Sequence, residues 1–128
     1  MAVLRNTAKE ALFSIEERVE ILREVLSGHP RCRVESFSGL LVTFMRQIGA
    51  RTIVRGLRAV SDFEAEFQMA LMNRRLDPRV ETVFLTPKEE YSYLSSRLTK
   101  EVFRLGGDLE GLVPKPVLER LHQRLVRV

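Results

Sequence analysis

Short β-branched runs alternate with longer stretches of helical periodicity along this chain, and this alternation constrains the fold more than any other feature. Arg33–Phe37, Thr52–Val54 and Glu81–Leu85 each predict a strand. Apolar residues at every third or fourth position between and after them predict helices. The apolar run Ala2–Leu4 is too short to assign by itself. Alternating strands and helices are typical of an α/β domain with a mainly parallel sheet flanked by helices.

The expected helices are marked by capping residues at their starts and by breakers at their ends. Their limits are Ser14 (in a capping box with Glu17) to Gly28, Leu40 to Gly49, Ser61 to Asp77, Ser95 or Ser96 to Gly106, and Pro114 or Pro116 to the C-terminus. For the third of these helices, the apolar spacing predicts a buried face made of Phe63, Phe67, Ala70 and Leu71.

Composition places the chain among ordinary globular proteins. Its 128 residues are 45% hydrophobic and 30% charged, which suits one domain with its own core. The N-terminus lacks the apolar segment of a signal peptide, so we expect a cytoplasmic protein. Cys32 is the single cysteine, which excludes an internal disulfide and suggests a bystander. The net charge of +4 favours an anionic partner, although most Lys and Arg side chains simply solvate a surface.

Cations gather in three loops that follow apolar runs: Arg5–Lys9, Arg55–Arg58 and Thr86–Arg97. In parallel α/β folds, ligands bind beyond the carboxyl ends of the strands, so we expect these loops at one edge of one sheet. Arginine forks and helix N-termini both bind phosphate, and Gly56 permits a close approach of the backbone. Each feature alone is more often structural, but together they predict a polyphosphate site. A nucleic-acid module is disfavoured, because the cations lie beside acids and form no single basic stripe.

These loops carry a resemblance to a known family. The segments VRGLRAVSDFEAEFQMALMNRRL, ETVFL, YSYLSSRLTKEV and GGDLEGLVP resemble bacterial phosphopantetheine adenylyltransferases over nearly the whole chain. The resemblance implies a Rossmann-like nucleotidyltransferase fold over residues 1–128. It also implies transfer of an adenylyl group from ATP to 4′-phosphopantetheine, giving dephospho-coenzyme A and pyrophosphate in coenzyme A biosynthesis. Magnesium and a homohexamer are further expectations, and a membrane or a nucleic acid is not expected as a partner.

The same resemblance implies roles for particular residues. Lys9 and Arg58 match catalytic positions that contact the phosphates, and Lys9, Leu41 and Arg55 match positions that hold phosphopantetheine. The ATP-binding positions are Gly56, Leu57, Arg58, Glu66, Tyr91, Ser92, Tyr93, Leu94, Ser95, Ser96 and Arg97. No metal-ligating residue is implied. At Arg97 the family usually has a small hydroxyl residue.

One motif of the family is absent from this sequence. Family members carry a Gly-x-Phe-Asp-Pro segment and a Gly-His pair, whose histidine stabilises the transition state, whereas His29 and His122 lie in other contexts. We interpret the chain as a shortened domain without the first strand, loop and helix, and we expect weak or no turnover. The alternative hypothesis is a non-catalytic remnant that binds a nucleotide or coenzyme A.

Overall fold

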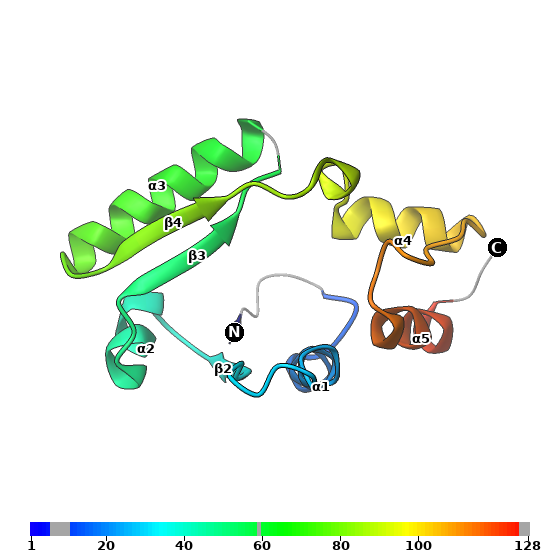
Figure 1. Ribbon diagram of the computed structural model, residues 1–128, viewed down its shortest axis with the longest axis horizontal. Coiled ribbons are helices and arrows are strands. Elements are labelled where there is room, and N and C mark those ends of the chain that lie inside the picture. The colour runs from blue at the N-terminus through cyan, green and yellow to red at the C-terminus, as the bar shows by residue number, and fades with distance from the viewer. Residues whose placement is uncertain (6–10, 59, 126–128) are drawn as a thin grey trace. The chain divides into compact units, whose positions relative to one another are not determined.

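The computed structural model describes residues 1–5, 11–58 and 60–125, and Figure 1 follows the chain from end to end. The chain divides into two compact units, which are described one at a time. The terminal unit contains residues 1–37 and 94–128, and the central unit contains residues 38–93. The expectation of a single domain over residues 1–128 stays a prediction.

The N-terminal half of the terminal unit is a strand pair with one helix. Strand β1 (Ala2–Leu4) pairs in parallel with β2 (Glu35–Phe37), so the short apolar run at the N-terminus is a strand. Helix α1 (Ile15–Val25) connects them in sequence and begins with the predicted capping box of Ser14 and Glu17. The buried side chains of Val3, Val19 and Val34 form the small core between these elements.

The C-terminal half of the terminal unit contains two helices, α4 (Ser96–Arg104) and α5 (Lys115–Arg124). Their core is built on Phe103, Leu109 and Leu121, which are almost fully buried. Two ion pairs join α5 to α1. Arg120 donates to Glu24 at 2.8 Å, and Arg124 pairs with Glu17.

The central unit contains α2 (Leu41–Ile48), β3 (Thr52–Gly56), α3 (Val60–Leu76), β4 (Glu81–Leu85) and the 3-10 turn η1 (Glu89–Tyr91). Strands β3 and β4 pair in parallel, with Thr52 opposite Glu81 and Gly56 opposite Leu85. The two arrows point the same way in Figure 1, and α3 runs beside β4. Val42, Met45 and Val80 form the core of this unit.

The strand and helix segments agree with the sequence, and both strand pairs are parallel, as a mainly parallel sheet requires. The described strands form two separate two-stranded sheets, β1–β2 and β3–β4. A sheet is continuous only where neighbouring strands exchange backbone hydrogen bonds, and the recorded ladders join the strands only within each pair. Strand β3 is longer than predicted, because Arg55 and Gly56 continue the ladder beyond Val54.

The predicted buried face of α3 is wrong for three of its four residues. Phe63, Phe67 and Leu71 are about half exposed, whereas Ala70 is partly covered. Asn73 is buried on the same side of the helix as Ala70. Phe63 still packs edge-on against Phe84 of β4, with ring centroids 6.2 Å apart, but polar side chains share the inward face, and hydrogen bonds from arginines satisfy two of the acids, Asp62 and Glu66. Apolar spacing alone could not indicate that choice.

No helix in the described part of the chain is long and apolar enough to cross a bilayer.

Candidate functional site

The parallel pairing of β3 and β4 brings the RGLR motif, Arg55–Arg58, next to the loop that follows β4. Gly56 lies opposite Leu85, the last residue of β4, and the Leu57 N–H donates to the Leu85 carbonyl at 2.9 Å. Both strands therefore end at the same edge of their sheet. The expectation that these two cationic loops share one edge is confirmed for this pair.

Arg55 is held by an acid of the neighbouring helix. Its Nε donates to Glu66 Oε2 at 2.6 Å, and its Nη2 donates to Glu66 Oε1, so the guanidinium and carboxylate planes meet side-on. This hydrogen bonding raises the pKa of Arg55 and, from the other side, lowers the pKa of Glu66. The structure thus brings together two of the predicted site residues, which lie 11 positions apart in sequence.

Arg58 is held in a similar way by Asp62, an acid in the first turn of α3. The Arg58 Nε donates to Asp62 Oδ2 at 2.9 Å, and Nη2 donates to Oδ1 at 3.3 Å. The backbone N–H of Arg58 also donates to Oδ2 at 3.3 Å. The hydrogen bond from the Arg58 side chain holds the pKa of Asp62 below its usual range. Both arginines of the motif therefore lie against carboxylates of α3.

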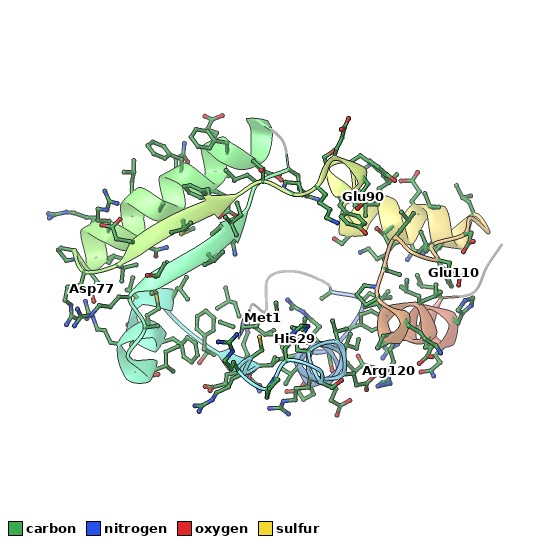
Figure 2. The ribbon with its side chains drawn as sticks, viewed as in Figure 1. Met1, His29, Asp77, Glu90, Glu110 and Arg120 are labelled. Carbon is green, nitrogen blue, oxygen red and sulfur yellow. The ribbon has the colours of Figure 1, made fainter. Side chains whose placement is uncertain are left out.

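The loop after β4 forms a shallow hollow with aromatic and charged walls. A pocket of about 680 Å³ is lined by Lys88, Glu89, Glu90, Ser92 and Tyr93, and Glu90 is labelled on this loop in Figure 2. The Ser92 hydroxyl donates to the Glu89 carbonyl at 2.8 Å, which fixes the turn. Tyr91 and Tyr93 are both exposed, so their rings are accessible at the surface. Aromatic faces of this kind suit stacking with a nucleobase.

The remaining predicted residues are placed as follows. Leu41 is half-buried and packs against the core of the central unit. Ser95, Ser96 and Arg97 belong to the terminal unit, where the Ser95 hydroxyl caps α4 by accepting from the Leu98 N–H at 3.1 Å. Leu94 precedes that cap and is half-buried, and Arg97 is exposed. Lys9 lies outside the described residues. The roles of all these residues stay predictions.

Sequence reasoning missed Asp62 as a member of this site. Its place in the first turn of α3, four residues after Arg58, was a usable signal, because a side chain in the first turn of a helix can accept hydrogen bonds from the residues that precede the helix. An acid at this position also has a purely local explanation, because a carboxylate is favourable near a helix N-terminus.

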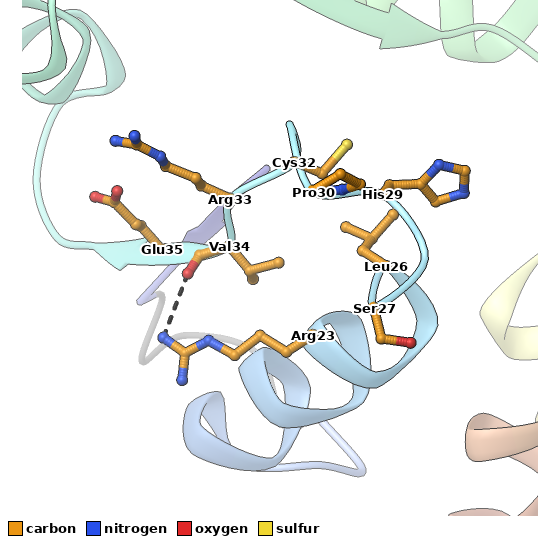
Figure 3. A pocket seen from close by; sticks show the side chains of 9 residues that line it. All are labelled: Arg23, Leu26, Ser27, His29, Pro30, Cys32, Arg33, Val34 and Glu35. Carbon is orange, nitrogen blue, oxygen red and sulfur yellow. Dashed lines mark hydrogen bonds between the residues drawn. The ribbon is translucent and has the colours of Figure 1, made fainter.

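A second hollow lies in the terminal unit, around the turn that follows α1. It has a volume of about 450 Å³, and its lining includes Arg23, His29, Cys32 and Arg33. Figure 3 shows Arg23 reaching across to the Val34 carbonyl, at 3.4 Å, while His29 and Arg33 point in different directions. His29 therefore lines a surface groove. The other histidine, His122, packs edge-on against Phe103, with ring centroids 4.9 Å apart.

Comparison with known proteins identifies the class of this α/β structure. A family model described as cytidylyltransferase-like matches residues 2–102, so the chain has a Rossmann-like nucleotidyltransferase fold. Several curated relatives are named phosphopantetheine adenylyltransferase. The protein from Heliobacterium modesticaldum is 56% identical over 124 residues, which are 97% of this chain and 74% of that protein. Those from Aromatoleum aromaticum and Nitrosomonas eutropha are 54% and 51% identical, over 98% and 100% of this chain and 77% and 78% of their own.

The chain belongs to the phosphopantetheine adenylyltransferase family. The resemblance of the RGLR and Ser-Ser segments to this family is thereby confirmed.

Proposed function

We propose that the chain binds ATP and 4′-phosphopantetheine and transfers the adenylyl group to the latter, giving dephospho-coenzyme A and pyrophosphate. One observation supports this most directly: Arg55 and Arg58 flank Gly56 at the edge where β3 and β4 end, beside the loop that carries Tyr91 and Tyr93. Cations, a close backbone and aromatic rings at one edge are what a nucleoside triphosphate requires. The family membership of the chain agrees with this proposal.

The reaction suits the residue types at this edge. The attacking group is a phosphate of phosphopantetheine, which is already an anion and needs little help from a general base. The site must bring two anions together and neutralise the charge that develops on the α-phosphate and the leaving pyrophosphate. Guanidinium groups in fixed orientations do this without reorganising during the reaction. Arg55 would hold phosphopantetheine, and Arg58 the phosphates of ATP.

Magnesium is proposed as a partner of the nucleotide. Within the described ranges, no group of three or more His, Cys, Asp or Glu side chains is arranged to hold a metal ion. We propose that Mg²⁺ would enter with ATP and would supply positive charge to the leaving pyrophosphate.

Two measurements on the chain test the proposal. Calorimetric titration with Mg-ATP and with 4′-phosphopantetheine measures binding, and mass spectrometry of a mixture of both measures dephospho-coenzyme A. We expect binding of both substrates and formation of the product. Because the sequence predicts weak or no turnover, the assay uses protein in excess over substrate. Failure to bind either substrate would contradict the proposal.

The second candidate is a non-catalytic binder of nucleotides or coenzyme A. It is favoured by the positions of the two histidines, one in the groove of Figure 3 and the other packed against Phe103. Neither contributes to the RGLR motif. Tight binding of ATP and coenzyme A with no product, even at a molar excess of protein, would select this candidate.

We also propose that the chain acts as a homo-oligomer, a hexamer as the family resemblance implies, and that it works in the cytoplasm. Support for self-association comes from α3, on which Met69, Met72 and Leu76 are exposed at helical spacing on one face. Exposed apolar stripes of this kind commonly mark contacts between proteins.

A further inference from the structure

Asp62 makes an unusual set of contacts for an acid in the first turn of a helix. Its Oδ2 accepts hydrogen bonds from the Arg58 backbone N–H at 3.3 Å and from Arg58 Nε at 2.9 Å. Its Oδ1 accepts from Arg58 Nη2 at 3.3 Å. A single carboxylate thus fixes both the backbone and the guanidinium of the last residue in the RGLR motif.

These contacts differ from those of an ordinary surface ion pair. An exposed pair four residues apart usually contributes little, because ordering two mobile side chains offsets the attraction. Here 27% of the Asp62 side chain and 42% of the Arg58 side chain are exposed, and Asp62 projects from α3, whose backbone is already ordered. The bond to the backbone amide adds a second constraint on its orientation. The carboxylate is therefore a rigid support for Arg58.

We propose that Asp62 is a positioning residue that holds Arg58 in the orientation in which it receives the phosphates of ATP. This inference rests on the proposed function, in which Arg58 contacts those phosphates. A side chain ordered before the ligand arrives loses less conformational entropy on binding, so affinity for the anion increases. Asp62 does not touch the substrate and acts only through Arg58.

Glu66 repeats the arrangement one helical turn later. Asp62 and Glu66 are four residues apart, so they project from the same face of α3. Glu66 holds Arg55 side-on, as Asp62 holds Arg58. The negative charge of Asp62 also works against the lowering of the Glu66 pKa that the Arg55 hydrogen bond causes. The two acids form one polar edge of α3 that aligns both arginines of the motif.

The opposite effect is conceivable in principle: a carboxylate on a guanidinium could compete with the phosphate and weaken its binding. The hydrogen bond to the Arg58 backbone N–H favours positioning, because a ligand that displaced the carboxylate would also release the loop. The two possibilities predict opposite changes in Mg-ATP affinity when Asp62 is neutralised: weaker binding if the acid positions Arg58, and tighter binding if it competes with the phosphate.

The test compares Asp62→Asn with Asp62→Glu, Arg58→Ala and the double variant. Asparagine keeps the shape but places an NH₂ donor where the guanidinium needs an acceptor. Glu64→Gln is the matched control, because Glu64 is an exposed acid in the same part of α3. Dissociation constants for Mg-ATP and for 4′-phosphopantetheine are measured by calorimetry, and far-UV circular dichroism checks that each variant is folded.

We expect Asp62→Asn to weaken Mg-ATP binding about tenfold. Phosphopantetheine binding should stay within about twofold, because Arg55 has its own acid. Asp62→Glu should recover most of the loss, and Glu64→Gln should change neither constant. Because Asp62 acts through Arg58, adding Asp62→Asn to Arg58→Ala should cause little further loss.

Unchanged or tighter Mg-ATP binding by folded Asp62→Asn would overturn the inference while leaving the proposed function intact. The inference would also be overturned if the losses of Mg-ATP affinity caused by Asp62→Asn and Arg58→Ala added fully in the double variant. If Asp62→Asn does not fold, a folded Asp62→Glu variant that binds Mg-ATP more weakly than Arg58→Ala would also overturn it. If the wild-type chain does not bind Mg-ATP, both the inference and the proposed function fail.

Discussion

Asp77 is the residue on which the central unit depends most for its internal geometry. Its side chain is 4% exposed and accepts hydrogen bonds from Arg46 Nε at 2.6 Å and from the Arg79 side chain and backbone at 3.0–3.1 Å. Arg46 also donates to the Leu76 carbonyl at 3.1 Å. Figure 2 shows Asp77 where α3 turns towards β4. One buried carboxylate therefore joins α2, the end of α3 and the start of β4.

Asp77→Asn should destabilise the chain, because it leaves two arginines facing a neutral group with one acceptor fewer. We expect the melting temperature to fall by roughly 5 °C or more. Thermal unfolding followed by circular dichroism measures this. The control is Asp108→Asn, which neutralises an exposed acid in the turn between α4 and α5. Equal shifts for the two variants would contradict this role of Asp77.

The same residue predicts a pH dependence. Hydrogen bonds from Arg79 and then Arg46 hold the pKa of Asp77 far below its usual range. A carboxyl with a depressed pKa in the folded state stabilises the protein above its unfolded pKa, about 4, and the stabilisation is lost as the pH falls below that value. The gap in melting temperature between wild type and Asp77→Asn should therefore be largest near neutral pH and shrink from about pH 5 to pH 3. A difference in melting temperature that stays constant with pH would contradict this role of the Asp77 carboxylate.

At the scale of residues, the sequence predicted local contacts well and non-local ones poorly. The capping box of Ser14 with Glu17 and the cap at Ser95 are confirmed, because both depend on residues three positions apart. The pairing of Arg55 with Glu66 depends on how the β3–α3 connection folds back. No spacing rule predicts that pairing.

At the scale of elements, helix α1 is the best-defined case of local stabilisation. The Ser14 hydroxyl accepts from the Glu17 N–H at 3.1 Å, and the Glu17 carboxylate accepts from the Ser14 N–H at 2.7 Å. The bond from the Ser14 N–H lowers the pKa of Glu17, and Arg124 of α5 lowers it further. Glu17 thus links the start of α1 to the end of α5.

Ser14→Ala should lower the free energy of unfolding by about 1 kcal/mol, because the first turn of α1 loses a hydrogen-bond acceptor. Urea denaturation followed by circular dichroism measures the change. Ser27→Ala, just beyond the C-terminal end of α1, is a control with the same change at an exposed site. If both variants lose the same stability, the cap contributes nothing.

The elements also show where apolar periodicity fails as a guide. Strand limits were predicted correctly for β4, but the prediction was two residues too short for β3 and two residues too long for β2. For α3 the limits were nearly right but the inward face was wrong. Its polar residues face arginines of other elements, whereas Phe63 stacks on Phe67 at 5.5 Å near the surface. Predicting a buried face from apolar periodicity assumes that acidic side chains face solvent. That assumption fails in α3, because Arg58 and Arg55 pair with Asp62 and Glu66.

At the scale of the whole molecule, the α/β class follows from the alternation of elements, because that pattern depends on the whole chain and tolerates local errors. The division of the strands into two pairs could not be predicted, because the residues of a strand do not specify which other strand it pairs with. The candidate site was only half predictable for the same reason. The RGLR motif, Glu66 and the loop after β4 were predicted, but Asp62 and the pairing of both acids with the arginines were not.

Self-association predicts a further result at this scale. A charge in the apolar stripe of α3 should break contacts between copies, so Met72→Glu should lower the oligomeric mass. Size-exclusion chromatography with light scattering measures that mass against 14.8 kDa for one chain. Thr43→Glu, at an exposed position of α2, should leave the mass unchanged. A wild-type chain that is monomeric at all concentrations would contradict the proposed oligomer.

The most direct test of the proposed adenylyl transfer is the formation of dephospho-coenzyme A by the wild-type chain and by Arg58→Ala. Protein in excess is mixed with Mg-ATP and 4′-phosphopantetheine, and the product is followed by mass spectrometry. We predict product from the wild type and from the control Arg51→Ala, and a rate at least tenfold lower from Arg58→Ala, with its melting temperature within about 2 °C of wild type. No product from the wild type, or equal rates from wild type and Arg58→Ala, would contradict the account.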